Sequence, residues 1–229
     1  MLAAVDAILR GQKCVSSRAA GHGVAAVEAR ALEGLQYHHF VVSDRQLERN
    51  GSCWHEARFY SEDGQLLDCL THFIGNTLKA GNSAVVVATE SHRNGLLPAL
   101  QAYGVDLGGT IEQGRYIAVD AADVLSTLIV NHMLDRGQFM NAVSNLILTA
   151  GKAAKGEHPR VALFGEGADL LWTRGYAQAA IEDEELCNEL IQTYDVDILC
   201  GYSTKSAEGI VNDHAYPRIC GAHSAVYPL

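Results

Sequence analysis

The sequence has few charged residues and few cysteines, and it lacks any hydrophobic run long enough to cross a bilayer. Charged side chains make up 19% of the 229 residues, against about 25% in ordinary domains. Six cysteines are too few for a disulfide scaffold, and no apolar run approaches the roughly 20 residues of a membrane-spanning helix. The carboxylate of Asp6 also argues against a signal peptide. These features predict a globular cytoplasmic protein with reduced thiols.

Basic residues are scarcest, with 17 Lys and Arg against 27 Asp and Glu and a net charge of −10. Residues 1–52 hold six of the basic and five of the acidic side chains, which leaves 11 and 22 for residues 53–229. A surface this acidic repels phosphate backbones. We therefore expect no direct nucleic-acid contact by residues 53–229.

Two catalytic motifs are also missing. The string G-x-x-x-x-G-K-[ST], whose amides and lysine hold nucleotide phosphates, does not occur. The turn after the first predicted strand, residues 60–64, presents two carboxylates in its place, so we expect no ATP or GTP binding. No G-x-S-x-G nucleophile elbow is present either.

Residues 1–52 differ from the rest of the chain. They predict two short helical pieces, one over residues 2–9 and one over 24–35, each too short to fold alone. Residues 4–16 resemble the last helix of a response-regulator receiver domain and its linker. We interpret residues 1–52 as a helical arm or linker, and place a domain boundary near Asn50.

Residues 53–229 alternate between predicted strands and helices. The strand at 83–88 is apolar on both faces, which is typical of a central parallel strand. Such alternation predicts an α/β fold in three layers, with a mostly parallel sheet covered by helices on both faces. The predicted strands are 54–60, 83–88, 115–119, 161–164, 197–200 and 218–226. The predicted helices are 63–79, 91–103 with Ser91 as N-cap, one opened by Asp120, 139–150, and 168–194 with a break at Gly175.

Several strings resemble one known family. The pattern His55-x-x-x-Phe59-Tyr60 comes first, followed by Ala88-Thr89 and His92-Arg93. Further matches in the same order are Gly114-Arg115-Tyr116 with Asp120-Ala121, Phe164-Gly165-Glu166 with Leu171-Trp172 and Gly175, Glu185-Leu186 with Asn188, Leu199-Cys200 with Tyr202, and Ile219-Cys220 with His223-Ser224. Over residues 54–228 the chain thus resembles the MEDS family, sensory domains of methanogen and methylotroph regulators that include a repressor responding to dichloromethane. One departure is Ser203, where the family often has proline.

The resemblance implies a RecA/KaiC-like core without a phosphate loop that senses small molecules in signal transduction or transcription. An output module, such as a DNA-binding or histidine kinase protein, is the implied partner, and a homodimer is another candidate. The ligand-binding residues that we expect on this basis are His55, Arg58, Phe59, Tyr60, Glu166, Cys200, Tyr202 and His223.

Two of these residues also stand out by position. Tyr60 ends a strand, beside the crevice where α/β folds bind ligands. Glu166 directly follows the strand 161–164, where a carboxylate serves either a functional site or the N-terminus of the next helix. His55 is equally compatible with a ligand contact and with a core imidazole that bonds a backbone carbonyl.

The sequence contains the residue types that bind zinc, but not the sequence spacing that is typical of zinc sites. Cys200, Cys220 and His223, with His55 and Glu166, supply the thiolate, imidazole and carboxylate groups that zinc prefers. They lack C-x-x-C spacing, and buried cysteines commonly act as small hydrophobes. We therefore expect no metal and no cofactor. The acidic run 182–185 is expected to be an exposed helix face.

Three functions remain open at this point. The first is a non-enzymatic small-molecule sensor that responds to hydrocarbon derivatives. The second is a hydrolase or degenerate ATPase that uses Glu166 as base with His55 or His223 as acid. The third is a protein interaction scaffold in which residues 1–52 dimerise.

Overall fold

The computed structural model describes residues 53–156, 158–205 and 215–228. The predictions for residues 1–52, including the helical arm and the receiver-like segment, lie outside this range. None of the helices in the described range combines the length and apolar character needed to cross a lipid bilayer.

A parallel sheet forms the middle layer. In the described part of the chain it has six strands in the order β3-β2-β6-β7-β1-β8, and every neighbouring pair runs parallel. This arrangement confirms the predicted α/β class. The strands are β1 (His55–Tyr60), β2 (Ser83–Ala88), β3 (Tyr116–Asp120), β6 (Val161–Gly165), β7 (Val196–Ser203) and β8 (Ala225–Pro228).

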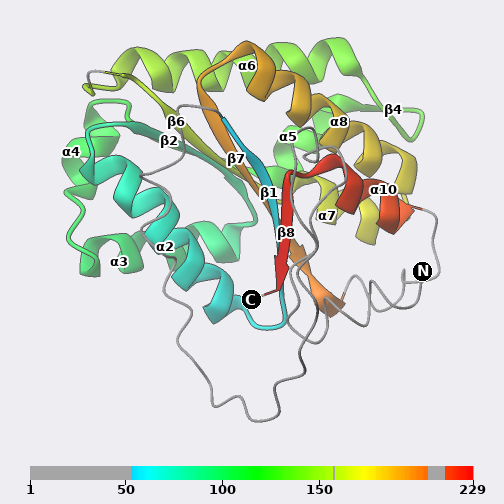
Figure 1. Cartoon of the computed structure of the whole chain (residues 1–229), viewed down its shortest axis with the longest axis horizontal. Helices are drawn as coiled ribbons and strands as arrows, with labels where there is room; N and C mark the ends of the chain where they lie inside the picture. The colour runs from blue at the N-terminus through cyan, green and yellow to red at the C-terminus, as the bar shows by residue number, and fades with distance from the viewer. Residues whose placement is uncertain (1–52, 157, 206–214, 229) are drawn as a thin grey trace, which may run out of the picture.

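Helices cover both faces of the sheet (Figure 1). One face packs against α2 (Asp63–Lys79), α3 (Glu90–Ala102) and α4 (Leu107–Glu112). The other face packs against α5 (Ala121–Leu128), α6 (Arg136–Ala153), α7 (Gly167–Thr173), α8 (Ala177–Thr193) and α10 (Ala215–Ala222). Two apolar cores, one on each side, therefore complete the predicted three layers.

Most elements lie where the hydrophobic pattern places them. Helix α2 and strand β2 have the predicted bounds, and Asp120 caps α5 by accepting the amides of Ala122 and Asp123. The predicted break falls at Gly175, whose φ of +83° suits glycine and separates α7 from α8. Two small elements were not predicted, namely α4 and the hairpin of β4 (Ile129–Val130) with β5 (Met133–Leu134).

Two of the differences between predicted and observed bounds change the interpretation. Residues 218–226 form the end of α10 and the start of β8 instead of one strand, because Ala215, Tyr216 and Ile219 are buried at helical spacing. Helix α3 begins two residues earlier than expected, since Thr89 and not Ser91 is its N-cap and accepts the His92 amide.

The connection from β1 to α2 consists only of Ser61 and Glu62. The backbone N–H groups of both residues point to Gln65 Oε1, at 3.2 and 3.3 Å. In a phosphate-binding loop such amides would face the ligand. Here a side chain of the same helix already occupies them.

Candidate functional site

Strand β1 divides the predicted ligand-binding residues between the two faces of the sheet. Because side chains alternate along a strand, His55 and Phe59 lie on the α8 side, whereas Arg58 and Tyr60 lie on the α2 side. Strand β1 lies between β7 and β8, so His55 belongs to an inner strand of the sheet. The described members of this set therefore belong to two separate polar groups, one on each face of the sheet.

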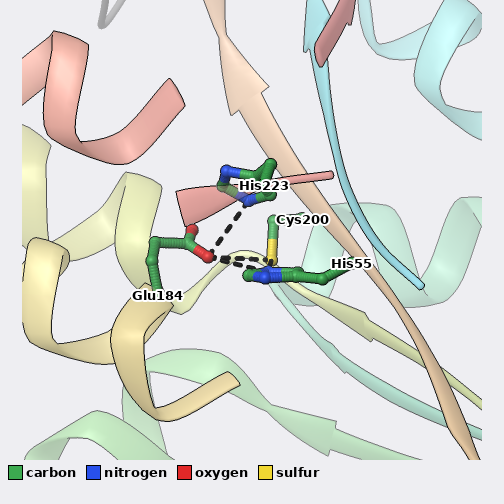
Figure 2. A group of neighbouring side chains, drawn as sticks. All are labelled: His55, Glu184, Cys200 and His223. Atoms are coloured by element: carbon green, nitrogen blue, oxygen red, sulfur yellow. Dashed lines mark hydrogen bonds and ion pairs between the residues drawn. The ribbon is translucent and has the colours of Figure 1, made fainter. Parts of the chain in front are cut away.

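The first group, which we call the interior cluster, consists of His55, Glu184, Cys200 and His223 (Figure 2). Their ligand-type atoms all lie within 4.8 Å of one another. Glu184 Oε2 is 2.9 Å from His55 Nε2, 3.1 Å from His223 Nε2 and 3.4 Å from Cys200 Sγ. The relative exposure of each residue is 4% or less. Strand β1, helix α8, strand β7 and the turn after α10 thus bring polar groups together in an apolar core.

A second layer of contacts fixes this cluster. His223 Nδ1 lies 2.7 Å from the carbonyl oxygen of Ile219, and His55 Nδ1 lies 3.3 Å from Asn188 Oδ1. The Tyr202 hydroxyl donates to Glu184 Oε1. Phe59 stacks on Tyr202, with ring centroids 5.0 Å apart. The predicted residues Phe59 and Tyr202 therefore support the cluster from outside it.

Electrostatics in the interior cluster favour a charged carboxylate. Burial alone would raise the pKa of Glu184, but His223 and His55 hold that pKa well below its ordinary value. Burial and the neighbouring His223 lower the pKa of His55. Burial also opposes charge on His223, yet Glu184 raises the pKa of this imidazole overall. The two imidazoles therefore differ in their tendency to carry a proton, although both contact the same carboxylate oxygen.

The second group, which we call the edge cluster, consists of Tyr60, Asp63, Thr89, His92 and Glu166. It lies at the carboxyl ends of β1, β2 and β6. Glu166 Oε1 is 2.5 Å from His92 Nδ1 and accepts the Tyr60 hydroxyl at 3.4 Å, while Oε2 accepts the Thr89 amide at 2.8 Å. The far nitrogen of His92, Nε2, lies 3.4 Å from the exposed carboxylate of Asp63. The edge cluster thus runs from the interior to the surface.

Glu166 occupies the N-cap position of α7 but makes no side-chain hydrogen bond to that helix. Its partners belong to β1 and to the start of α3. The hydrogen bond to Glu166 raises the pKa of His92 against the effect of burial. Burial, followed by the charge of Glu166, raises the pKa of Tyr60. The capping interpretation of Glu166 is therefore wrong.

The structure also places three other candidate residues. Glu166 does not join His55, Cys200 and His223, because Glu184 supplies the carboxylate there. Cys220 is half-buried on α10 and lies outside the four-residue group. Arg58 contacts Glu56 at 3.3 Å and stacks over the Tyr227 ring at 4.0 Å.

The acidic run 182–185 contains the residue that sequence reasoning missed. Asp183 and Glu184 are 7% and 0% exposed, so the predicted solvated face is wrong. Glu184 lies four residues after Ala180 and three before Cys187, which are both buried on α8. A helical period applied to α8 would have placed Glu184 in the apolar stripe. His92 was noted only as part of a matching string.

The fold and the edge cluster identify the class of this protein. It is an α/β domain with a parallel sheet and a polar cluster at the carboxyl ends of its strands, where this class of fold binds ligands. The family model for the methanogen/methylotroph, DcmR sensory domain, MEDS, matches residues 54–216. The chain therefore belongs to the MEDS family of sensory domains, which confirms the resemblance. No curated protein matches the sequence.

Proposed function

We propose that this chain is a non-enzymatic sensor of small molecules, in particular of small hydrocarbon derivatives, and that its ligand binds at the edge cluster. The family supports a sensory role. The observation that carries the location is His92, which is 6% exposed and whose Nε2 faces the exposed Asp63 carboxylate at 3.4 Å without the geometry of a hydrogen bond. A polar ligand at this position would give the buried nitrogen a hydrogen bond of ordinary length and geometry.

The surroundings of His92 suit a small polar ligand. Glu166 accepts a hydrogen bond from Nδ1, so a protonated His92 presents an N–H donor at Nε2, on the side of Asp63. Tyr60 packs edge-on against the imidazole, with ring centroids 5.7 Å apart. One donor beside an aromatic ring would bind the polar group of a short-chain compound and leave its carbon atoms against Tyr60.

The signal would pass to an output module, for which a DNA-binding protein or a histidine kinase is the partner that we propose, in the cytoplasm. Helix α3 begins at the edge cluster with Thr89 as its N-cap, and Glu166 connects α3 to β6 and β1. A ligand on His92 would shift α3 only by its differential affinity for two states. We propose α3 as the first element to respond.

The test is ligand-induced thermal stabilisation with dichloromethane, methanol and methylamine as probes. We expect at least one probe to stabilise the parent protein, by about 2.7 kcal/mol at 100 times its Kd. Tyr60→Phe and His92→Gln should remove most of this stabilisation. The matched controls are Tyr116→Phe, a tyrosine with the same 5% exposure, and His72→Gln on the surface of α2. Equal stabilisation of all five proteins would place the ligand elsewhere.

One observation favours an enzyme as the second candidate. The Glu166–His92 contact of 2.5 Å joins a carboxylate to an imidazole, as in a general acid–base pair. The pair differs from the expected one, because His55 and His223 contact Glu184 instead. Turnover of p-nitrophenyl acetate by the parent protein, abolished in His92→Gln but not in His72→Gln, would favour a hydrolase over the sensor.

A further inference from the structure

We propose that the interior cluster binds one divalent transition-metal ion in tetrahedral geometry, with zinc as the ion that best fits the donors. The four donors are His55 Nε2, Glu184 Oε2, Cys200 Sγ and His223 Nε2. The proposal reverses our expectation from spacing alone. It is independent of the ligand site at the edge cluster.

The distances fit such an ion. Zinc–ligand bonds of 2.0–2.3 Å in a tetrahedron place neighbouring donor atoms about 3.3–3.8 Å apart. The contacts of Cys200 Sγ are 3.3 Å to His55 Nε2 and 3.4 Å to Glu184 Oε2. The contacts of Glu184 Oε2 with the two imidazoles are 2.9 and 3.1 Å. Small movements of the side chains, outward for these four pairs and inward for a pair near the 4.8 Å limit of the group, would therefore complete the coordination sphere.

Hydrogen bonds outside the cluster determine which ring nitrogens face its centre. His223 Nδ1 must carry a proton, since its partner is the Ile219 carbonyl, which can only accept. Asn188 turns its NH₂ group towards the carbonyls of Glu184 and Ala222, so that its oxygen faces His55 and accepts a proton from Nδ1. In the neutral form, both rings then point Nε2 lone pairs inward. Metal-ligating histidines are held in this way by outer partners.

With both imidazoles in this neutral form, the centre of the cluster has fewer protons than acceptors. Glu184 Oε2 and the two Nε2 lone pairs converge there, and the Cys200 thiol brings one hydrogen. His223 Nε2 lies 3.1 Å from the carboxylate without the geometry of a hydrogen bond, and it is buried without a hydrogen-bond partner. A cation between these atoms would satisfy all of them together.

The charges also balance. A thiolate and a carboxylate contribute two negative charges, and two neutral imidazoles contribute none. A divalent cation makes the group neutral overall, which a fully buried site requires because an isolated charge in an apolar core is very costly. Four protein ligands leave no open position, so the site would be structural and not catalytic. It would fasten α8, α10 and the start of β8 to the sheet.

The first experiment measures metal in the full chain, purified without a tag and passed over a gel-filtration column. We expect one zinc per chain by inductively coupled plasma mass spectrometry. After removal of zinc, added Co²⁺ should give the visible bands of a tetrahedral site and a near-ultraviolet thiolate-to-cobalt band. Only trace metal together with no cobalt spectrum would overturn the proposal.

The second experiment assigns the donors. Cys200→Ser should remove the thiolate band, whereas Cys69→Ser, which changes a buried cysteine of the opposite core, should keep it. Asn188→Ala retains all four donors and should weaken cobalt affinity about 10- to 100-fold. A thiolate band that survives in Cys200→Ser would place the metal elsewhere and overturn the assignment. If Cys200→Ser fails to fold, an Asn188→Ala variant whose cobalt affinity equals that of the parent protein would likewise overturn the assignment.

Discussion

The interior cluster and the edge cluster contain the same kinds of side chain but differ in their access to solvent. Both hold a buried glutamate against a histidine, Glu184 with His55 and Glu166 with His92. The interior cluster is enclosed by the sheet, α8 and α10, whereas the edge cluster ends at Asp63, whose side chain is 67% exposed. Burial on all sides favours a structural role, and a path to the surface favours binding.

The largest effect should follow from removing the interior carboxylate. We expect Glu184→Ala to lower the free energy of unfolding by about 3–5 kcal/mol, because it removes one member of a fully buried charged group. Urea denaturation measures this change. Glu185→Ala is the control, since Glu185 is the next residue on α8 but is 56% exposed, and its ion pair with Arg218 should contribute under about 1 kcal/mol. Similar losses in both variants would contradict the burial argument.

A smaller loss should follow at the edge cluster. Glu166→Ala leaves the Thr89 amide and His92 without their acceptor, and we expect a loss of about 2–3 kcal/mol in urea denaturation. Glu166→Gln keeps an acceptor for the amide, so it should lose roughly half as much. A larger loss in the free energy of unfolding for Glu166→Ala than for Glu184→Ala would contradict the structural role assigned to the interior cluster.

The sequence predicts the layers well because apolar patterns decide them. The strand 83–88 and the helix 63–79 bury continuous or helically spaced apolar residues, and both match the structure. The strand predicted over 218–226 failed because a short helix and a short strand share that segment. Eight or nine residues carry too little periodicity to separate two such elements.

The site was predicted only in part, for two physical reasons. His55 and Tyr60 belong to one matching string, yet the alternation of a strand directs them to opposite faces of the sheet. The charge of Glu184 suggested a solvated face, and its partners are distant in sequence, so only the assembled fold shows why a carboxylate is buried there. The sequence predicts which residue types lie at the carboxyl ends of the strands, but it does not predict which of these side chains contact one another.

The pH dependence of stability should separate the clusters further. Because Glu166 raises the pKa of His92, this interaction stabilises the fold fully below the ordinary histidine pKa of about 6.5 and is lost as pH rises through the higher folded-state pKa. The urea midpoint of the parent protein should therefore fall over that interval more than that of His92→Gln. His72→Gln should follow the parent curve. Identical slopes for parent and His92→Gln would contradict the assigned pair.

The last prediction is the absence of an effect, because we expect no binding of nucleotides. The amides of Ser61 and Glu62 are already bonded to Gln65, and the edge cluster presents carboxylates. Isothermal titration of ATP or GTP with Mg²⁺ should give only the heat of dilution. Micromolar, magnesium-dependent binding would show that the edge cluster accepts phosphate. The proposed difference between the edge cluster and the closed interior cluster would then need revision.

The place of β1 in the sheet has a consequence for the order of folding. This strand comes early in the chain, yet its neighbours are β7 and β8, so that His55 pairs with Ile198 and Glu56 with Ala225. During synthesis β1 cannot pair until β7 and β8 have been made. Strands β2, β3 and β6 lie within residues 83–165 and can pair with one another earlier. Contacts this distant in sequence slow folding. We therefore expect the interior cluster to form last, after His223 has left the ribosome.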